Sequence, residues 1–303
     1  MRLAVAALVT LAAAAPAGAR APLRPGDRAA IDVSVATLWK APNLARAIDR
    51  PSLTNPADPA RWSRNLATTE SRVWLDSHVQ TQALYGQQVV VLARSGAWAK
   101  VAVVDEPDPQ DSHGYPGWLP VSQLAPDFSR SRRTVVVTAR TGLLRVHDRT
   151  LELSYGTQLP SLGADRVRTP DGIGTITGAT PPLAPSNGSI IAQARRFLGT
   201  HYLWGGLSSW GFDCSGLIWD VYRAHGMTIP RDADPQRHHG TPVARDLLRP
   251  GDLLFFGSPT YAEHVAIYLG NDRMLEAPDS AHRVRIAPVR WTYYIGARRY
   301  LAA

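Results

Sequence analysis

The sequence predicts an α+β protein in which two small β-barrels precede a domain that begins with helices and ends with strands. Short strand-like runs separated by turn residues fill residues 31–180. A Pro-rich segment follows at 181–188, and residues 189–303 then change from helical periodicity to strand-like alternation. The chain has 303 residues, enough for two or three domains of roughly 100–200 residues each.

The N-terminus has the pattern of a secretory signal peptide. A short charged start precedes an apolar run over residues 3–15, and Ala17-Gly18-Ala19 supplies the small residues of a cleavage site. A membrane-spanning helix needs about 20 apolar residues, so this run is too short to be one. We therefore expect residues 1–19 to be removed and the mature protein to reach the periplasm or the cell exterior, without stable membrane insertion.

Residues 31–126 and 127–180 are predicted to be the two barrels, because short strands at this density are typical of small barrels. The predicted strands are 89–92, 98–104 and 118–120 in the first barrel, and 134–138, 142–146 and 151–153 in the second. A short repeat supports two copies: residues 84–89 and 154–159 share Tyr, Gly and Gln at the same spacing. Residues 181–188 are then a semi-rigid linker.

Two helices should open the last domain, residues 189–303. Ser189 can cap the first, which ends at Gly199 and carries apolar residues at helical spacing. Asp213 can cap the second, where Leu217, Ile218, Val221 and Tyr222 recur at intervals of three and four. The second helix therefore has Cys214 in its first turn.

Cys214 is the only cysteine of the chain, so it can form no internal disulfide in an oxidising compartment. Two interpretations are open: an inert buried side chain, or a reactive thiol. The free N–H groups and the positive dipole at a helix N-terminus favour the thiolate, and they can also bind the oxyanion of a tetrahedral intermediate. Asp-x-Ser would cap a helix in any protein, but that does not explain why the single cysteine lies there.

His264 is the best candidate for the base that such a thiol needs. Residues 263–270 alternate as a strand, with His264 on the face opposite Val265 and Ile267. The turn at 270–272 should return the chain antiparallel, which places Glu276 opposite Ala266 and diagonal to His264. Cysteine, histidine and carboxylate then form a triad by role.

The composition and the spacing of potential ligands argue against nucleic-acid binding and against a metal site. The formal net charge is +8, but the Arg residues are scattered, which favours attraction to an anionic cell envelope over nucleic-acid binding. The adjacent His238 and His239 are expected to be surface residues, and no Cys/His set has the spacing of zinc ligands. We therefore expect no metal, no cofactor and no nucleic-acid partner, and the oligomeric state stays open.

Five segments within residues 189–300 share their order and spacing with a known family. They are Leu198-Gly199-Thr200-His201-Tyr202-Leu203-Trp204-Gly205-Gly206, Phe212-Asp213-Cys214-Ser215-Gly216, Ile229-Pro230-Arg231 with Gln236, Arg249-Pro250-Gly251-Asp252-Leu253-Leu254-Phe255-Phe256, and His264-Val265-Ala266-Ile267-Tyr268-Leu269-Gly270. These segments resemble the NlpC/P60 cysteine peptidases. The resemblance implies a papain-like fold and a Cys–His pair that cleaves peptidoglycan stem peptides, usually between γ-D-Glu and the diamino acid. It also implies that Tyr202 lines the active site and assists the oxyanion.

The N-terminal half resembles bacterial SH3-type domains, on Thr81-Gln82-Ala83-Leu84-Tyr85-Gly86 and Gly114-Tyr115-Pro116-Gly117-Trp118-Leu119-Pro120. This architecture is similar to that of γ-D-glutamyl-L-diamino acid endopeptidases, whose first SH3-type domain selects stem peptides with a free N-terminal L-Ala. The resemblance implies substrate-binding residues at Asp213, Ser215, Tyr115, Gln87 and Trp204. Two positions depart from the usual pattern: Glu276 stands where the third catalytic residue is most often His, and Gln87 stands where Glu often follows Tyr-Gly.

Two alternative functions fit the same residues. The fold could support an amidase or acyltransferase that passes its thioester to an amine, or the protein could bind cell wall without catalysis. The presence of both Cys214 and His264 favours a hydrolase.

Overall fold

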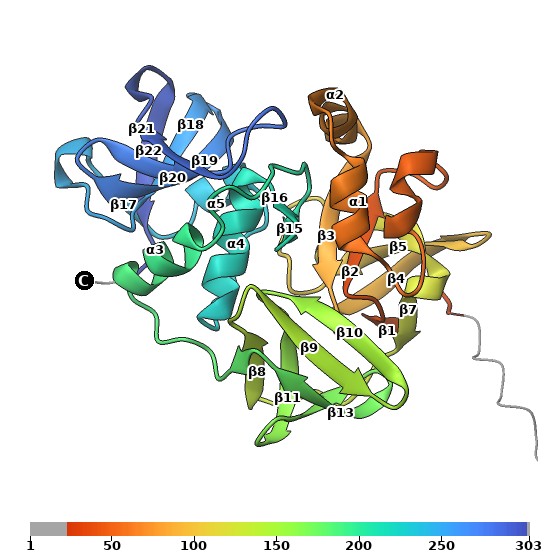
Figure 1. The fold of residues 1–303 in the computed structure, drawn as a ribbon. Helices are drawn as coiled ribbons and strands as arrows, with labels where there is room; N and C mark the ends of the chain where they lie inside the picture. The colour runs from red at the N-terminus through yellow and green to blue at the C-terminus, as the bar shows by residue number, and fades with distance from the viewer. Residues whose placement is uncertain (1–22, 302–303) are drawn as a thin grey trace, which may run out of the picture.

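The computed structural model describes residues 23–301, which form two β-barrels and a C-terminal α+β domain (Figure 1). The expected signal peptide lies outside the described residues. Within residues 23–301, no helix has both the length and the apolar character needed to cross a membrane.

The first barrel is a seven-stranded antiparallel sheet with the order β3-β2-β6-β5-β4-β1-β7. Its strands are β1 (Arg28–Ile31), β2 (Val35–Trp39), β3 (Val79–Leu84), β4 (Gln88–Ser95), β5 (Trp98–Val103), β6 (Tyr115–Pro120) and β7 (Leu124–Pro126), with the short helix η3 (Val121–Gln123) before β7. The three strands expected here are present as β4, β5 and β6. The barrel begins three residues before the expected boundary at residue 31.

The second barrel has the same strand order with every number raised by seven, β10-β9-β13-β12-β11-β8-β14. Its strands are β8 (Thr134–Val137), β9 (Thr141–Val146), β10 (Arg149–Ser154), β11 (Gln158–Gly163), β12 (Arg166–Thr169), β13 (Gly172–Thr177) and β14 (Ala179–Thr180). The shared order confirms that the short sequence repeat marks two copies of one fold. The glycines of the repeat, Gly86 in the first barrel and Gly156 in the second, turn the chain at φ values of 79° and 78°. Glycine enters this left-handed region without strain.

A helical segment between β2 and β3 is not predicted by the sequence analysis. It contains η1 (Ala47–Ser52), α1 (Pro59–Asn65), α2 (Thr69–Val73) and η2 (Trp74–Ser77). Asp58 caps α1 by accepting a hydrogen bond from the Arg61 N–H, and Pro59 occupies the first helical position. These helices are too short to show apolar periodicity, so the caps were the only local signal.

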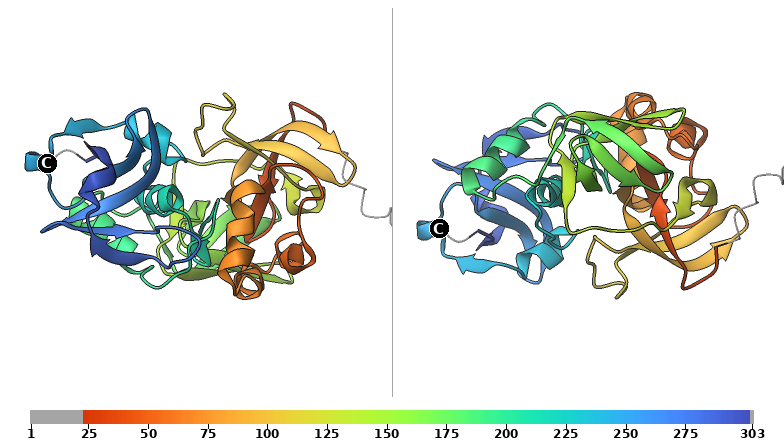
Figure 2. Two further views of the ribbon diagram at one scale, coloured as in Figure 1. Left: turned by 90° about the horizontal axis from the view of Figure 1, so that it is seen from above. Right: turned by 90° about the horizontal axis from the view of Figure 1, so that it is seen from below.

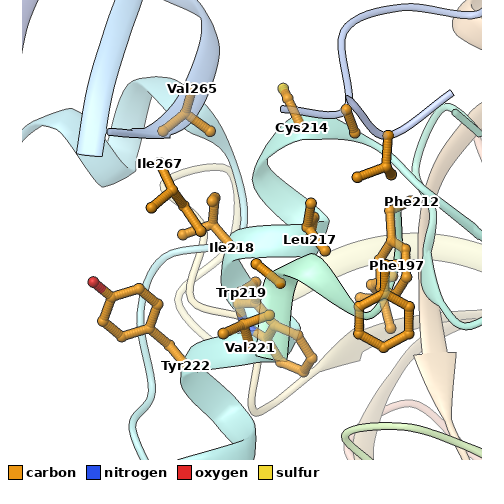
Figure 3. Packing of buried hydrophobic residues seen from close by; sticks show 14 of the residues in the cluster. Phe197, Phe212, Cys214, Leu217, Ile218, Trp219, Val221, Tyr222, Val265 and Ile267 are labelled. Atoms are coloured by element: carbon orange, nitrogen blue, oxygen red, sulfur yellow. The ribbon is translucent and has the colours of Figure 1, made fainter. Parts of the chain in front are cut away.

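The C-terminal domain packs α4 (Cys214–Ala224) against a six-stranded antiparallel sheet with the order β17-β22-β18-β19-β20-β21. The remaining elements are α3 (Asn187–Arg195), β15 (Leu207–Ser208), β16 (Gly211–Phe212), α5 (Ala233–Arg237), β17 (Thr241–Val243), η4 (Arg245–Leu247), β18 (Leu253–Ser258), β19 (Tyr261–Gly270), β20 (Arg273–Glu276), β21 (Arg285–Pro288), η5 (Trp291–Tyr293) and β22 (Tyr294–Arg299). Leu217, Ile218 and Val221 of α4 pack on Val265 and Ile267 of β19, with Cys214 at the edge of this cluster (Figure 3).

The expected bounds of α3 are wrong at both ends. Ser186, not Ser189, is the cap: its side chain accepts a hydrogen bond from the Ser189 N–H. The helix then ends at Arg195, and the chain turns before Gly199. Residues 187 and 188, which were assigned to the linker, are therefore helical. The Ser186 hydroxyl can cap a helix as well as the Ser189 hydroxyl can, and the sequence alone does not distinguish the two.

The repeated Tyr-Gly turn joins each domain to the next one along the chain. Tyr85 of the first barrel is fully buried in the core of the second barrel. Tyr155 of the second barrel is fully buried in the core of the C-terminal domain, where its ring meets Phe197 edge-on with 5.0 Å between centroids. The repeat thus supplies an anchoring aromatic residue at both junctions.

The C-terminal domain also contacts both barrels through hydrogen bonds. In two further views it lies against the barrels rather than extending away from them (Figure 2). The Leu207 N–H donates to Gln82 of the first barrel at 3.2 Å, and Gln158 of the second barrel donates to the Arg223 carbonyl at the end of α4 at 2.7 Å. The second barrel therefore contacts the C-terminal end of α4, which carries Cys214, while the first barrel contacts β15, which packs against α4.

Candidate active site

Cys214 is the first residue of α4, as the sequence predicts. Asp213 caps the helix by accepting a hydrogen bond from the Gly216 N–H at 2.6 Å. A helix provides no acceptor for the N–H groups of its first turn, so those of Cys214 and Ser215 point away from the helix interior. The thiol is largely buried, with 8% of the residue exposed. A buried thiol at this end of a helix lies next to donors that can bind a developing oxyanion.

His264 lies on β19 with its imidazole between Cys214 and Glu276. Its Nε2 is 2.8 Å from the Glu276 Oε2, and the other ring nitrogen is left for the hydrogen bond with the Cys214 thiol. The expected register is confirmed: Ile267 pairs with Leu275, which brings Glu276 level with Ala266. The turn has two residues rather than three, and a bulge before Gly270 compensates for the missing one.

Glu276 is held by two arginines that the sequence analysis did not identify. Arg290 donates Nη1 to Oε1 at 2.9 Å and Nη2 to Oε2 at 2.7 Å, and Arg285 donates Nε to Oε1 at 3.1 Å. Burial would raise the pKa of the carboxyl, but the bonds with His264 and Arg290 lower it to about 2. The Glu276 carboxylate is therefore charged at any pH at which the protein would work.

The surroundings of His264 favour the protonated form of its imidazole. Burial alone would lower its pKa, but hydrogen bonds and charges from Cys214 and Glu276 outweigh burial and raise the pKa to about 9. Near neutral pH the ring is therefore an imidazolium between a sulfur and a carboxylate. This arrangement provides an acid that can protonate a leaving amine and, once deprotonated, a base for water.

We expect an NMR titration of the His264 ring to show a midpoint near pH 9, against the ordinary value of 6.5. In Glu276→Gln the midpoint should fall, because the imidazolium loses its carboxylate. Since the folded-state pKa is raised, the stabilisation from this charge is complete below about pH 6.5 and is lost as the pH rises through about 9. A wild-type midpoint near 6.5 would contradict the proposed imidazolium.

Cys214 opens into a pocket of about 120 Å³ at the junction of the first barrel and the C-terminal domain. The residues that line it are Lys40, Gln80, Tyr115, Tyr202, Trp204, Asp213, Cys214, Ser215, Asp232, Ala233, Tyr261, Ala262 and Glu263. Burial raises the pKa of Tyr202 well above its usual range, so its phenol keeps its proton and can donate a hydrogen bond. Trp204 ties the two domains together, since its Nε1 donates to the Val79 carbonyl at 3.1 Å.

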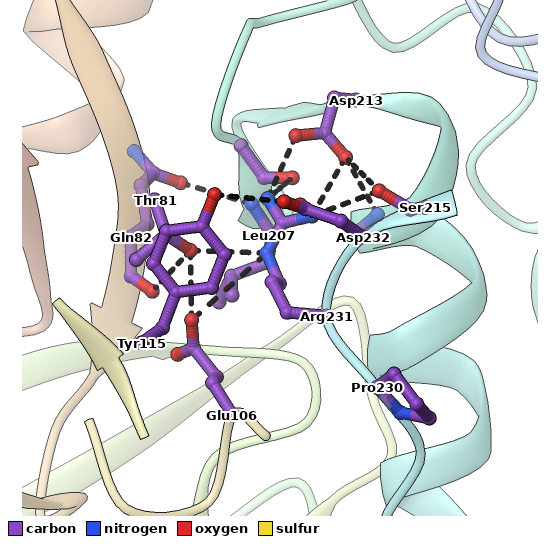
Figure 4. Close-up of polar contacts among 12 residues, drawn as sticks. Thr81, Gln82, Glu106, Tyr115, Leu207, Asp213, Ser215, Pro230, Arg231 and Asp232 are labelled. Carbon is purple, nitrogen blue, oxygen red and sulfur yellow. Dashed lines mark hydrogen bonds and ion pairs between the residues drawn. The ribbon is translucent and has the colours of Figure 1, made fainter. Parts of the chain in front are cut away.

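A fully buried guanidinium, Arg231, connects the cap of α4 to the first barrel (Figure 4). It donates Nη1 and Nη2 to the two oxygens of Asp213, at 3.0 and 2.7 Å, and Nε to Thr81 Oγ1 at 3.0 Å. Thr81 in turn donates to the buried Glu106 at 2.7 Å. The residue that caps the nucleophile's helix is therefore positioned through a hydrogen-bond chain that begins in another domain.

Asp232 is, with Glu263, one of two acidic residues of the pocket that the sequence analysis missed. Its Oδ2 accepts a hydrogen bond from the Tyr115 hydroxyl at 2.9 Å, and its Oδ1 is 3.8 Å from Arg231. Burial raises the pKa of Asp232 to about 6. The adjacent Arg231 in the matched Ile-Pro-Arg segment was the only sequence signal, because the contact with Tyr115 crosses between domains.

The structure brings eight of the nine expected site residues to the pocket or the Cys–His pair. Gln87 is the exception: it does not line the pocket, and its role at the substrate stays a prediction. Its side chain folds back and accepts a hydrogen bond from the Leu84 N–H, which closes the turn at Gly86 away from the pocket. The first barrel instead presents Gln80 and Lys40 to the pocket.

Papain-like cysteine peptidases combine this α+β fold with a helix-borne thiol and a strand-borne imidazole, and the protein is an enzyme of that class. It belongs to the NlpC/P60 family. The sequence pattern of that family matches residues 199–300.

Known relatives extend the likeness beyond that segment. A γ-D-glutamyl-L-lysine dipeptidyl-peptidase of Bacillus cereus is 39% identical over 305 residues, covering 91% of either chain. The crystal structure of an NlpC/P60 family protein from Bacillus cereus superposes with a TM-score of 0.86 at 38% identity, covering 91% of this chain and 100% of that one. The peptidoglycan endopeptidase RipA of Mycobacterium tuberculosis is 37% identical over 114 residues, 33% of this chain and 24% of the relative.

Proposed function

We propose that this enzyme hydrolyses peptidoglycan stem peptides at the bond between γ-D-Glu and the diamino acid, and that it prefers peptides with a free N-terminal L-Ala. The observation that carries the proposal is the charge around Arg231. One buried guanidinium faces the carboxylates of Asp213 at 2.7 Å and Asp232 at 3.8 Å. Burial raises the pKa of the third neighbour, Glu106 at 3.9 Å, to about 8, so Glu106 does little to offset the charge of Arg231 near neutral pH. The excess negative charge beside Cys214 suits a substrate ammonium. The name of the Bacillus cereus relative supports the choice of bond.

In the proposed reaction, the Cys214 thiolate attacks the γ-carbonyl carbon of D-Glu. The oxyanion of the tetrahedral intermediate accepts hydrogen bonds from the N-terminus of α4 and the Tyr202 hydroxyl. The His264 imidazolium protonates the leaving amine of the diamino acid, and a thioester remains on Cys214. The neutral His264 then removes a proton from water, which attacks the thioester and releases L-Ala-D-Glu and the free thiolate. Glu276 keeps the imidazole oriented throughout.

The substrate's amino end is proposed to bind against Asp232, with Tyr115, Asp213 and Ser215 around it. Asp213 and Ser215 are already engaged with Arg231, which donates to Ser215 Oγ at 3.0 Å. Asp232 is the less committed carboxylate, because besides the hydrogen bond from Tyr115 it has only a looser contact with Arg231, at 3.8 Å. The first barrel closes this end of the pocket through Tyr115 and Gln80, which would exclude a substituent on the amine.

The test is mass spectrometry of the products from L-Ala-γ-D-Glu-meso-diaminopimelate and from the same peptide with its amine acetylated. We expect L-Ala-D-Glu from the free peptide and little or no cleavage of the acetylated one. Asp232→Asn should raise KM for the free peptide about 10- to 100-fold, the effect of losing one charged hydrogen bond. Asp165→Asn, an exposed change in the second barrel, is the matched control.

Equal cleavage of both peptides would contradict the preference for a free amine but not the choice of bond. Cleavage of neither would contradict the proposal as a whole, and it would shift attention to transfer of the acyl group to an amine acceptor. Product analysis with an added amine nucleophile separates these cases, because transfer leaves the acceptor's mass on the product.

The place of action and the domain roles are also proposed. Export through residues 1–19 would bring the enzyme to the cell envelope, where peptidoglycan is found. Residues 31–126 and 127–180 would act as SH3-like domains that complete the cleft and support α4, with residues 189–303 as the catalytic domain.

A further inference from the structure

Lys40 is the only cationic side chain among the described residues that line the pocket. The same pocket exposes three carboxylates, those of Asp213, Asp232 and Glu263. Lys40 directly follows β2, and its backbone N–H donates to the His78 carbonyl at 2.9 Å. It therefore belongs to the wall that the first barrel builds, next to the strand end at which Trp204 is anchored.

The ammonium of Lys40 has N–H groups that are available to hydrogen-bond with a ligand. Nζ donates to the Asp76 carbonyl at 3.2 Å, and its charge also opposes the rise that burial causes in the pKa of the Asp76 carboxyl. Within residues 23–301, no carboxylate is close enough to form an ion pair with Lys40. An ammonium has three N–H donors, so at least one remains for a ligand. The carboxylates of the pocket repel an anionic group of a ligand, and the exposed ammonium of Lys40 attracts it. Lys40 is therefore the place in this pocket where an anion would bind.

The proposed substrate has an anionic group close to the scissile bond. A γ-linked glutamyl residue uses its side-chain carboxyl in the peptide bond, so its α-carboxylate stays free. With the amine of L-Ala at Asp232 and the γ-carbonyl at Cys214, this carboxylate lies along the stretch between them. Asp213, Asp232 and Glu263 would repel it, and the wall from the first barrel is the part of the pocket that offers a cation.

We propose that Lys40 binds the free α-carboxylate of the γ-linked D-glutamyl residue and selects it over the amidated form, D-isoglutamine. The inference rests on the proposed function, because it takes the bond cleaved and the direction of the substrate from it. It makes Lys40 a specificity residue supplied by the first barrel, in addition to the wall that closes on the amine. Amidation of the carboxylate would remove the charge that Lys40 attracts.

The experiment compares kcat/KM for two peptides, L-Ala-γ-D-Glu-meso-diaminopimelate and its D-isoglutaminyl counterpart. Wild type should prefer the carboxylate form about tenfold or more, the effect of one charged hydrogen bond. Lys40→Met keeps an unbranched apolar side chain and removes the charge. It should lower kcat/KM about tenfold for the D-Glu peptide alone, so that the preference disappears. Lys40→Arg should restore part of it.

The matched control is Lys100→Met, since Lys100 is the only other lysine of the chain and lies on β5, away from the pocket. It should leave both substrates unchanged. Equal losses on both peptides in Lys40→Met would overturn the proposal and make Lys40 a support of the wall. No loss on either would place the α-carboxylate elsewhere. In both of these cases wild type still cleaves, so the proposed function stands; failure of wild type to cleave either peptide would overturn both.

Discussion

Cys214→Ala is expected to abolish peptide hydrolysis, with a loss on the order of 10⁴-fold or more in kcat/KM. No neighbouring hydroxyl can replace the thiol: Ser215 accepts from Arg231 and donates to Asp213, so its oxygen is held within the cap network. The fold should survive, because the change removes one sulfur atom at the edge of the core. Steady-state assays and thermal unfolding of the variant measure the two effects separately.

Alkylation offers an independent check on the same residue. One equivalent of iodoacetamide should inactivate the wild type, since the chain has a single cysteine, and should leave no label on Cys214→Ala. Ser161→Ala, a similarly small change in the second barrel, should keep full activity. Turnover by Cys214→Ala with its fold intact would remove Cys214 from the mechanism.

His264→Ala should cost far more activity than Glu276→Gln. His264 both protonates the leaving amine and activates water, so we expect a loss on the order of 10³-fold or more. Glu276→Gln should cost about 10- to 100-fold, the usual effect of removing a group that orients another. An amide oxygen can still accept from the imidazole, and only the charge is lost. Measurement of kcat/KM for both variants, with thermal unfolding to confirm folding, tests this order.

Glu152→Gln is the matched control, since Glu152 is exposed on β10. Losses of equal size in His264→Ala and Glu276→Gln would show that the Glu276 charge, rather than orientation alone, is essential to the reaction. A loss in Glu276→Gln that came with a large drop in unfolding temperature would point instead to the buried pairs with Arg285 and Arg290.

The catalytic trio could be predicted because each part depends on local sequence. Asp213 followed by apolar residues at helical spacing places Cys214 at a helix start. Alternation in β19 and its turn fix which face His264 and Glu276 share, and a bulge restores the register when the loop is one residue shorter than expected. Local periodicity is sufficient wherever a side chain and its partner lie on one hairpin.

The substrate side of the pocket could not be predicted in the same way. Tyr115 and Asp232 are 117 residues apart in the chain and meet only when two domains pack. Arg231 and Thr81 are separated by 150 residues. The direction of the Gln87 side chain could not be predicted for a related reason: the motif located the turn correctly, but the direction of a side chain after a left-handed glycine depends on the turn's own hydrogen bonds.

The two buried tyrosines, Tyr85 and Tyr155, also bear on when the enzyme becomes active. A chain emerges from the ribosome N-terminus first, and domains tend to fold in that order. In that order the first barrel would form before the partner for Tyr85 exists, and the second before the partner for Tyr155. Residues 187–301, which carry the nucleophile, come last and fold against a surface that is already built. The core around Cys214 includes Tyr155 of the second barrel, so a chain without that barrel lacks part of the surface on which the catalytic domain packs.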